Sequence, residues 1–278
     1  MPDLSKINIR DVSVSFASTS NAPPLTVLDQ VSLDVQTGEF ICIVGPSGCG
    51  KTTLLKAVAG LVRPTSGDIA VNGRRIEGPG TDRAVVFQYD CLLPWRTVLK
   101  NTMLGWDIRG NKGKEAEEKA RYYLDLVGLG RFADYLPSQL SGGMRQRVNL
   151  ARALAIEPDI LLMDEPFAAL DAQTRELMQA ELLRIWNDSR RTVMFITHQV
   201  DEALFLGDRV VVMGTRPGRI LDDLPVSFAR PRTLSVKRSP TFTEMAEHIW
   251  SKLVSENQRS AQLETEHNAA RSGDRPSA

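Results

Sequence analysis

Residues 40–55 carry the clearest structural signal in this chain and read Phe40-Ile41-Cys42-Ile43-Val44-Gly45-Pro46-Ser47-Gly48-Cys49-Gly50-Lys51-Thr52-Thr53-Leu54-Leu55. An apolar run of strand length comes first, then a turn rich in glycine, then an apolar stripe with helical spacing. Residues 45–52 fit the pattern G-x-x-x-x-G-K-[ST], and both flanks are of the kind that the pattern requires. The order predicts a buried strand, a tight loop and a helix that begins at the loop.

A loop of this kind is suited to holding phosphate groups. Its glycines let successive backbone N–H groups point inward, and the helix that follows adds the partial positive charge of its N-terminus. We expect Lys51 to neutralise the β- and γ-phosphates and the Thr52 hydroxyl to bind Mg²⁺. Nucleotide contacts are expected from Gly45, Pro46, Ser47, Gly48, Cys49, Gly50, Lys51, Thr52 and Thr53. The competing interpretation is an ordinary glycine-rich turn with an exposed lysine.

Cys49 adds an expectation about reactivity. It lies close to Lys51 and to the predicted start of a helix, and such surroundings can lower the pKa of a thiol. If the loop belongs to an ATP-hydrolysing site, for which the next motif gives the evidence, we expect maleimide to inhibit hydrolysis and ATP to protect against it.

A second motif follows another apolar run. Residues 160–163 are apolar and are followed at once by Asp164 and Glu165. Two adjacent carboxylates make a poor core, but ligands bind at the carboxyl edge of a parallel sheet. We expect Asp164 to hold Mg²⁺ through its water shell and Glu165 to polarise the attacking water as general base. With the glycine-rich loop, this pair indicates a P-loop nucleotide hydrolase.

The remaining pattern predicts an α/β protein. Short, nearly continuous apolar runs are typical of parallel strands covered on both faces by helices, and they occur at residues 40–44, 84–87, 160–163, 192–196 and 209–213. Apolar residues alternate over 7–16, as one bulged strand or two short ones, and again over 31–35, which predicts a small antiparallel sheet.

Domain boundaries follow from the same patterns. Residues 89–158 show helical spacing without a clear strand, which indicates an inserted helical subdomain within a domain that covers residues 5–235. A helical extension is expected over 236–255. The polar stretch 256–278 is expected to be disordered.

Charge and hydropathy limit the partners. Lysine and arginine total 34, aspartate and glutamate total 34, and the net charge is therefore zero, so nothing favours a nucleic-acid partner. No apolar run approaches the roughly 20 residues that span a bilayer. The first residues lack an apolar signal segment, and the three cysteines are an odd number, which fits a reducing compartment. We expect a cytoplasmic protein that reaches a membrane only by docking on another subunit.

A third motif brings in a family resemblance. The stretch Leu140-Ser141-Gly142-Gly143-Met144-Arg145-Gln146-Arg147 resembles the signature sequence of ATP-binding cassette (ABC) ATPases. The motifs also stand in the order of that family over about residues 5–230. The resemblance implies a RecA-like parallel-sheet core with an N-terminal antiparallel β subdomain and an inserted α-helical subdomain. It also implies a head-to-tail homodimer in the ATP-bound state, with each ATP between the loop of one copy and the signature of the other.

The resemblance assigns further roles by motif. Gln88 would contact Mg²⁺ and the attacking water, and His198 would hydrogen-bond the γ-phosphate. Asp171 would shape the contact between subunits, and Phe16 stands where an aromatic residue stacks on adenine. Nucleotide contacts from the opposite subunit would come from Ser141, Gly142 and Gly143. Gln199 and Arg145 depart from the residues usual in the family. Neither is expected to touch the phosphate, so these departures bear on the fine tuning of the activity and not on the activity itself.

Finer matches resemble the branch of importers for nitrate, sulfonates and taurine, with taurine the first choice of solute. They include Leu92-Leu93-Pro94-Trp95, an apolar patch where the family receives transmembrane permease subunits. The resemblance implies an ATPase at the cytoplasmic face of the inner membrane, supplied indirectly by an extracytoplasmic solute-binding protein. Importers of aliphatic sulfonates, nitrate or a thiamine-precursor pyrimidine remain open, as does a regulatory dimer switched by ATP without transport.

Overall fold

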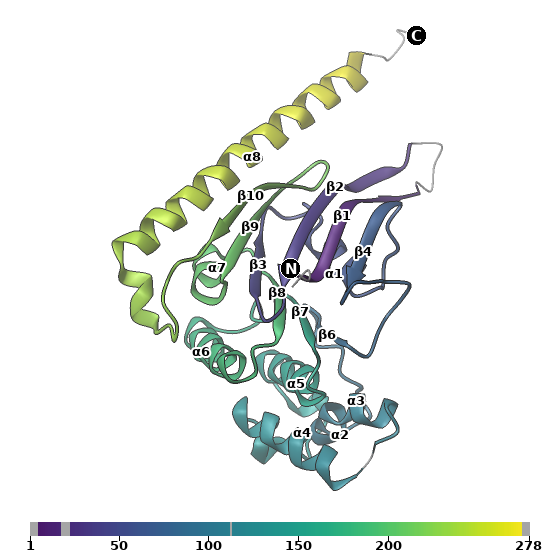
Figure 1. Cartoon of the computed structure of the whole chain (residues 1–278), viewed down its shortest axis with the longest axis vertical. Coiled ribbons are helices and arrows are strands. Elements are labelled where there is room, and N and C mark those ends of the chain that lie inside the picture. Colours follow the sequence, from purple (N-terminus) through teal and green to yellow (C-terminus); the bar gives the residue numbers. More distant parts are fainter. Residues whose placement is uncertain (1–4, 18–22, 112, 274–278) are drawn as a thin grey trace.

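The main sheet of the computed structural model has six strands, five of them parallel, and antiparallel β10 at one edge (Figure 1). The structure describes residues 5–17, 23–111 and 113–273, with side chains to residue 262. Strand order across the sheet is β10 (Arg219–Pro225), β9 (Arg209–Gly214), β3 (Phe40–Val44), β8 (Thr192–Ile196), β7 (Ile160–Asp164) and β6 (Arg83–Val86).

Both faces of this sheet are buried, which explains the continuous apolar runs. Every residue of β3 is buried, as is every residue of β7 and β8. Alternate residues of β3 enter different cores: Ile41 and Ile43 pack on one side, and Phe40, Cys42 and Val44 on the other. A strand covered on both faces gains burial from every side chain, so alternation disappears from its sequence. The predicted parallel α/β core is confirmed.

One face is covered by helix α1 (Lys51–Val58) and by a second, antiparallel sheet. The order of that sheet is β2 (Leu25–Gln36), β1 (Ser5–Phe16), β4 (Ser66–Val71) and β5 (Arg74–Arg75). Strand β1 is a single strand whose register against β2 shifts between Ile9 and Val12, where Asp11 adopts a φ of 46°. The alternative with one bulged strand is therefore the correct one.

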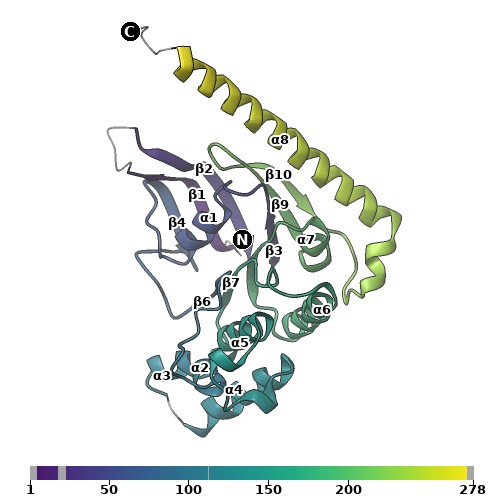
Figure 2. The same cartoon turned by 180° about the vertical axis from the view of Figure 1, so that it is seen from behind.

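The other face is covered by helices. They include α6 (Ala172–Ser189) and α7 (Val200–Leu206), which follow β7 and β8 along the chain. Between β6 and β7 the chain forms the helices α2 (Val98–Thr102), α3 (Leu104–Ile108), α4 (Lys114–Leu126) and α5 (Gly142–Ala155), with short 3₁₀ turns η1 (Gly130–Phe132) and η2 (Pro137–Gln139). Figures 1 and 2 show α2, α3 and α4 gathered at one end of the molecule, below α5. No strand lies between β6 and β7 in the described residues.

The C-terminal segment differs from the expectation. After the 3₁₀ turn η3 (Leu234–Arg238), helix α8 (Pro240–Gly273) runs past residue 255, where we expected disorder to begin. Figures 1 and 2 show it beside β9 and β10 and then extending beyond the sheet. The reason is local: Glu256 is only 4% exposed, and its carboxylate has partners in the core. A polar composition predicted disorder because the contacts of the Glu256 carboxylate cannot be seen in the sequence. Residues 274–278 lie outside the described residues.

None of the helices in the described part of the chain combines the length and apolar character needed to cross a bilayer.

Candidate functional site

The glycine-rich loop joins the carboxyl end of β3 to α1, as its motif predicts. Gly50 is the residue before the helix and has a φ of 92°, a left-handed conformation that favours glycine. A Cβ atom on Gly45 would lie 2.7 Å from the carbonyl oxygen of Met213. Helix α1 has no side-chain cap, so the first amides of the helix lack side-chain partners. The loop therefore presents backbone donors at a helix N-terminus, where an anion binds favourably.

Lys51 is folded back onto this loop. Its ammonium donates to the carbonyl oxygen of Gly45 at 2.7 Å and to that of Pro46 at 3.0 Å. The residue is only 7% exposed, so the charge is held inside the loop by carbonyl dipoles. The alternative of a merely exposed lysine is wrong. A phosphate in the loop would offer this ammonium a full negative charge in place of two carbonyl oxygens.

The expectation for Cys49 is contradicted. Its side chain is completely buried, with Sγ 3.7 Å from the Lys51 Nζ. Burial raises the pKa of the Cys49 thiol, and the nearby Lys51 charge offsets that effect only in part. The sequence argument counted the positive neighbours but could not count the loss of water. Cys49 is a packed, protonated thiol, and inhibition by maleimide at this residue is not expected.

The acidic pair lies next to the loop at the carboxyl edge of the sheet. The Thr52 hydroxyl donates to Asp164 Oδ1 at 3.0 Å, so α1 and β7 meet there. Burial raises the pKa of Asp164, and the Thr52 hydrogen bond lowers it in part. Two oxygen side chains from different elements thus converge beside the phosphate loop. Oxygen donors of this kind suit Mg²⁺, which commonly keeps water and substrate phosphates as its other ligands. Among the described residues no group of three or more His, Cys, Asp or Glu forms a metal site of its own.

Glu165 and His198 are brought together although they are far apart in the chain. The His198 Nδ1 and Glu165 Oε2 atoms are 3.0 Å apart. Glu165 has a φ of 46°, and its amide donates to the carbonyl oxygen of Ile196 at 3.0 Å, which ties the end of β7 to β8. A left-handed glutamate costs on the order of 1–3 kcal/mol and persists only where its surroundings hold it. The outlier places a carboxylate and an imidazole side by side at the edge where the loop also lies.

Gln88 lies in an exposed turn after β6, and α5 holds the backbone of that turn. Gln146 and Asn149 both donate to the carbonyl oxygen of Phe87, at 3.2 and 3.1 Å. The Arg152 guanidinium donates to the carbonyl oxygens of Asp90 and Cys91, at 3.0 and 2.8 Å.

Sequence reasoning did not single out Gln146, Asn149 or Arg152. Their signal was a polar residue at every third position of a helix whose other inner residues are apolar.

The signature segment lies at the start of α5. The Ser141 hydroxyl caps the helix by accepting from the Met144 amide at 3.3 Å, and Ser141 and Gly142 are exposed. No hydrogen bond joins Ser141 to the phosphate loop within the described residues. Asp171 caps α6 through the Thr174 amide at 2.9 Å, and this hydrogen bond lowers the pKa of Asp171. These residues form a second set of exposed helix starts in the same chain.

Phe16 ends β1, directly opposite Leu25 at the start of β2. Their exposed fractions are 44% and 67%, so an aromatic and an aliphatic side chain stand together in solvent. An exposed apolar pair at a strand end is available for stacking. Leu25 was not identified from the sequence.

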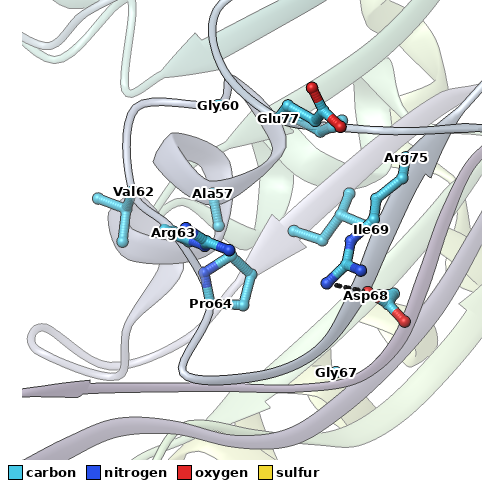
Figure 3. A pocket seen from close by; sticks show the side chains of 11 residues that line it. Ala57, Gly60, Val62, Arg63, Pro64, Gly67, Asp68, Ile69, Arg75 and Glu77 are labelled. Atoms are coloured by element: carbon cyan, nitrogen blue, oxygen red, sulfur yellow. Dashed lines mark ion pairs between the residues drawn. The ribbon is translucent and has the colours of Figure 1, made fainter.

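The cavity in Figure 3 lies elsewhere. It has a volume of about 330 Å³ between the end of α1 and strands β4 and β5, and Arg75 pairs there with Asp68 at 2.6 Å. It contains none of the motif residues. The phosphate loop and the acidic pair lie together at the carboxyl edge of the main sheet. Loop, helix start and acidic strand end together define a P-loop nucleotide hydrolase.

Comparison with known proteins narrows the class. A family profile described as ABC transporter matches residues 28–168, about half of the chain. The chain is 48% identical over 261 residues to the taurine import ATP-binding protein TauB of Rhizobium johnstonii, covering 92% of this chain and 99% of that protein. It is 46% identical over 253 residues to the nitrate import ATP-binding protein NrtD of a Synechocystis strain, covering 89% and 94%. The chain belongs to the ABC transporter family and is an ATPase of that family.

A solved structure agrees. The dimeric post-hydrolysis state of the ATP-binding cassette MJ0796, bound to ADP and Pi, superimposes with a TM-score of 0.72 at 30% identity. The match covers 80% of this chain and all of that one. Fold and family therefore rest on independent comparisons.

Proposed function

We propose that this chain is the ATP-hydrolysing subunit of an importer for a small anionic or zwitterionic solute, with taurine the first candidate. The observation that carries the proposal is the convergence of Thr52 with Asp164, and of Glu165 with His198, beside one phosphate loop. An ATP-binding protein needs only the loop, whereas hydrolysis also needs a base beside the γ-phosphate. The importer assignment is supported by the names of the relatives.

In this proposal Thr52, Asp164 and Gln88 hold Mg²⁺, which would neutralise charge on the β- and γ-phosphates. Glu165 accepts the proton of the attacking water, and His198 orients Glu165 and contacts the γ-phosphate. The 3.0 Å contact between the two side chains supports this pairing, because a base whose orientation is fixed loses less entropy in the transition state. Lys51 exchanges its carbonyl partners for phosphate oxygens. Phe16 stacks on the adenine, with Leu25 beside it.

The site is completed by a second copy of the chain. Ser141, Gly142 and Gly143 present a helix start to solvent, and such a start is suited to an anion. The solved relative described as dimeric supports a head-to-tail homodimer when ATP is bound, with Asp171 at the contact between copies. Since each copy supplies half of each site, ATP favours the dimer and hydrolysis releases it.

The permease contact is proposed on the face around the Leu92-Leu93-Pro94-Trp95 stretch. Trp95 is 74% exposed, and Tyr89 and Ile108, also in the segment between β6 and β7, are 80% and 76% exposed. A hollow of about 510 Å³ is lined by Trp95, Leu99, Met103 and charged neighbours. Exposed large apolar residues around a hollow mark a docking surface. Contact with a transmembrane subunit would place the ATPase at the cytoplasmic face of the inner membrane.

Transported solute does not touch this subunit, and relatives named for taurine and for nitrate are almost equally similar. A solute-binding protein on the far side of the membrane would therefore set the choice. The test is the ATPase activity of the complex reconstituted with the permease and the solute-binding protein that are encoded by adjacent genes. We expect taurine to stimulate hydrolysis, and stimulation by nitrate alone would correct the solute.

A variant tests the docking face directly. Trp95→Glu should abolish co-purification with the permease and leave the ATPase of the isolated chain intact. The matched control is Trp250→Glu, because Trp250 is an exposed tryptophan on α8, a helix that Figure 1 shows away from α2, α3 and α4. Permease binding that survives Trp95→Glu would move the contact elsewhere. Absence of any permease partner would favour a regulatory dimer.

A further inference from the structure

Two side chains of helix α8 form hydrogen bonds with the backbone of Thr215, which lies in the turn between β9 and β10. Glu256 Oε1 accepts a hydrogen bond from the Thr215 amide at 2.9 Å, and the Arg259 guanidinium donates to the Thr215 carbonyl oxygen at 3.1 Å. Glu256 and Arg259 also pair with each other at 3.0 Å. Both polar backbone groups of Thr215, a residue only 6% exposed, are thus satisfied by side chains of the C-terminal helix. We call Glu256 and Arg259 the Thr215 clamp.

The clamp is held in place by further contacts. Arg219 of β10 lies 3.3 Å from Glu256 Oε2, so the carboxylate joins α8 to both sides of the turn. A Cβ atom on Gly214 would come within 2.8 Å of Glu256 Oε1, which shows how closely helix and strand approach. Burial raises the pKa of Glu256, but the hydrogen bonds from Arg259 and Thr215 and the charge of Arg219 outweigh it, and the pKa lies below its usual value. The carboxylate is therefore charged at neutral pH.

The same turn forms the rear wall of the phosphate loop. A Cβ atom on Gly218 would lie 2.2 Å from the carbonyl oxygen of Cys49, so the two backbones are in contact. At the other end of the loop, a Cβ atom on Gly45 would lie 2.7 Å from the carbonyl oxygen of Met213. Both ends of the loop therefore rest on the β9–β10 hairpin. Packed backbones without a side chain between them cannot shift independently.

The turn also contacts the strand that leads to the proposed adenine site. The Gly218 amide donates to the Val27 carbonyl oxygen at 2.9 Å, and its own carbonyl accepts from the Asp29 amide at 3.0 Å. Val27 lies two residues after Leu25 on β2. One turn thus supports the phosphate loop and the start of β2.

We propose that the Thr215 clamp is a positioning device for nucleotide binding: through the β9–β10 turn, helix α8 holds the phosphate loop in its binding shape. The proposal rests on the nucleotide site described above. Glu256 and Arg259 touch no phosphate, and they act only through the turn. Release of the clamp lets the turn and the loop move together, so the loop must be ordered again when ATP binds. A partner that binds the C-terminal helix would thereby change the affinity of the chain for ATP.

The experiment compares Glu256→Ala with Glu247→Ala in the full chain. Glu247 is an exposed carboxylate on the same helix, so its removal changes the charge equally without touching the turn. We expect Glu256→Ala to raise the Kd of a fluorescent ATP analogue and the KM for ATP about 3- to 10-fold, the size of coupling that such networks carry. Turnover at saturating ATP should stay within about twofold, because Glu165 and His198 are untouched. Glu247→Ala should match the parent chain.

Hydrogen exchange and a conservative variant separate positioning from general stability. Exchange should increase at the Thr215 amide and at the amides of residues 45 and 47–52 in Glu256→Ala, but not in Glu247→Ala. Glu256→Gln keeps an acceptor for the Thr215 amide and loses the charge, so its Kd should fall between the two. If Glu256→Ala folds poorly, Arg259→Ala tests the same proposal with the same expected changes. The Arg259 side chain is 41% exposed, so removing it leaves less of the core unfilled.

Unchanged nucleotide affinity in a variant whose Thr215 amide exchanges freely would overturn the proposal. A fall in turnover at saturating ATP without a change in KM would also overturn it, since that pattern assigns the clamp to the chemical step. If the parent chain itself fails to bind the analogue, the nucleotide site is wrong and not the clamp. The two failures are therefore distinguishable.

Discussion

Two helix starts in this molecule carry glycine-rich sequences, and they differ in what surrounds them. At α1 the lysine is buried and held by two carbonyl oxygens of the loop, and Thr52 donates to Asp164. At α5 the start is exposed, and the only side-chain cap is the Ser141 hydroxyl. At the first start, one chain gathers a lysine, a threonine and a carboxylate beside the glycine-rich loop. The second start has the Arg145–Asp90 ion pair beside it, at 2.9 Å, and in our proposal it is the half of a site that faces the opposite copy. Four predictions test this difference.

The largest effect is expected at the complete site. Glu165→Gln keeps the shape of the side chain and removes its basic oxygen, so turnover should fall by about 100- to 10,000-fold, the usual contribution of a general base. ATP affinity should be retained, because the loop is unchanged. Steady-state ATPase and analogue binding measure the two quantities. Near-normal turnover would remove Glu165 from the role of base, and a chain that remains monomeric with ATP would remove the α5 start from the site.

The next effect is measured in mixtures of two variants, each of which is altered at one of the two helix starts. Ser141→Arg should lower turnover about 100-fold, as loss of a donor to a developing charge does, while a single chain still binds ATP. Lys51→Ala should lose ATP binding in its own chain. A mixture of the two variants contains one site with an intact loop and an intact signature, so activity should partly return. Mixtures as inactive as either variant would contradict a site shared between chains.

A smaller effect is expected where α5 meets the turn that carries Gln88. Asn149→Ala removes one of two donors to the Phe87 carbonyl oxygen and should cost about 1–3 kcal/mol of unfolding free energy. Hydrogen exchange should rise at residues 87–91. Denaturant unfolding measures the first quantity, and Gln173→Ala on the exposed face of α6 is the control. Equal stability of both variants would show that α5 does not hold this turn.

The smallest effect concerns the cysteines. Cys91 is exposed and should react quickly with maleimide, whereas Cys49 is buried and its pKa is raised, so it remains a protonated thiol from pH 6 to pH 8 and reacts slowly. Peptide mass spectrometry assigns the label, and Cys91→Ser should remove the fast phase. ATPase activity should survive a single labelling. Rapid modification of Cys49 would mean that the loop opens far more often than its packing indicates.

The parts of the site that could be predicted are those whose signal is contiguous. A strand, a glycine turn and a lysine are adjacent in the chain, so the phosphate loop was visible, as were Asp164 and Glu165 at the end of an apolar run. Contacts between distant segments were not visible. The clasp of α5 on the turn after β6, the pairing of Phe16 with Leu25 and the clamp on Thr215 all join residues that only folding brings together.

Cys49 and Glu256 show the limit most clearly. Both were judged by their neighbours in the chain, one as a reactive thiol and the other as the first residue of a disordered tail. Their behaviour depends on how much water each one loses, and burial is a property of the whole fold.

Sequence alone determined the class of protein, because hydrophobic periodicity and a phosphate-binding turn are local properties that eight to sixteen adjacent residues can specify. Tertiary structure alone decided that Glu165 meets His198, that the Cys49 thiol is buried, and that the last helix continues past Glu256. The physical reason is that solvation and through-space contact act between segments, so they have no value until the segments have packed.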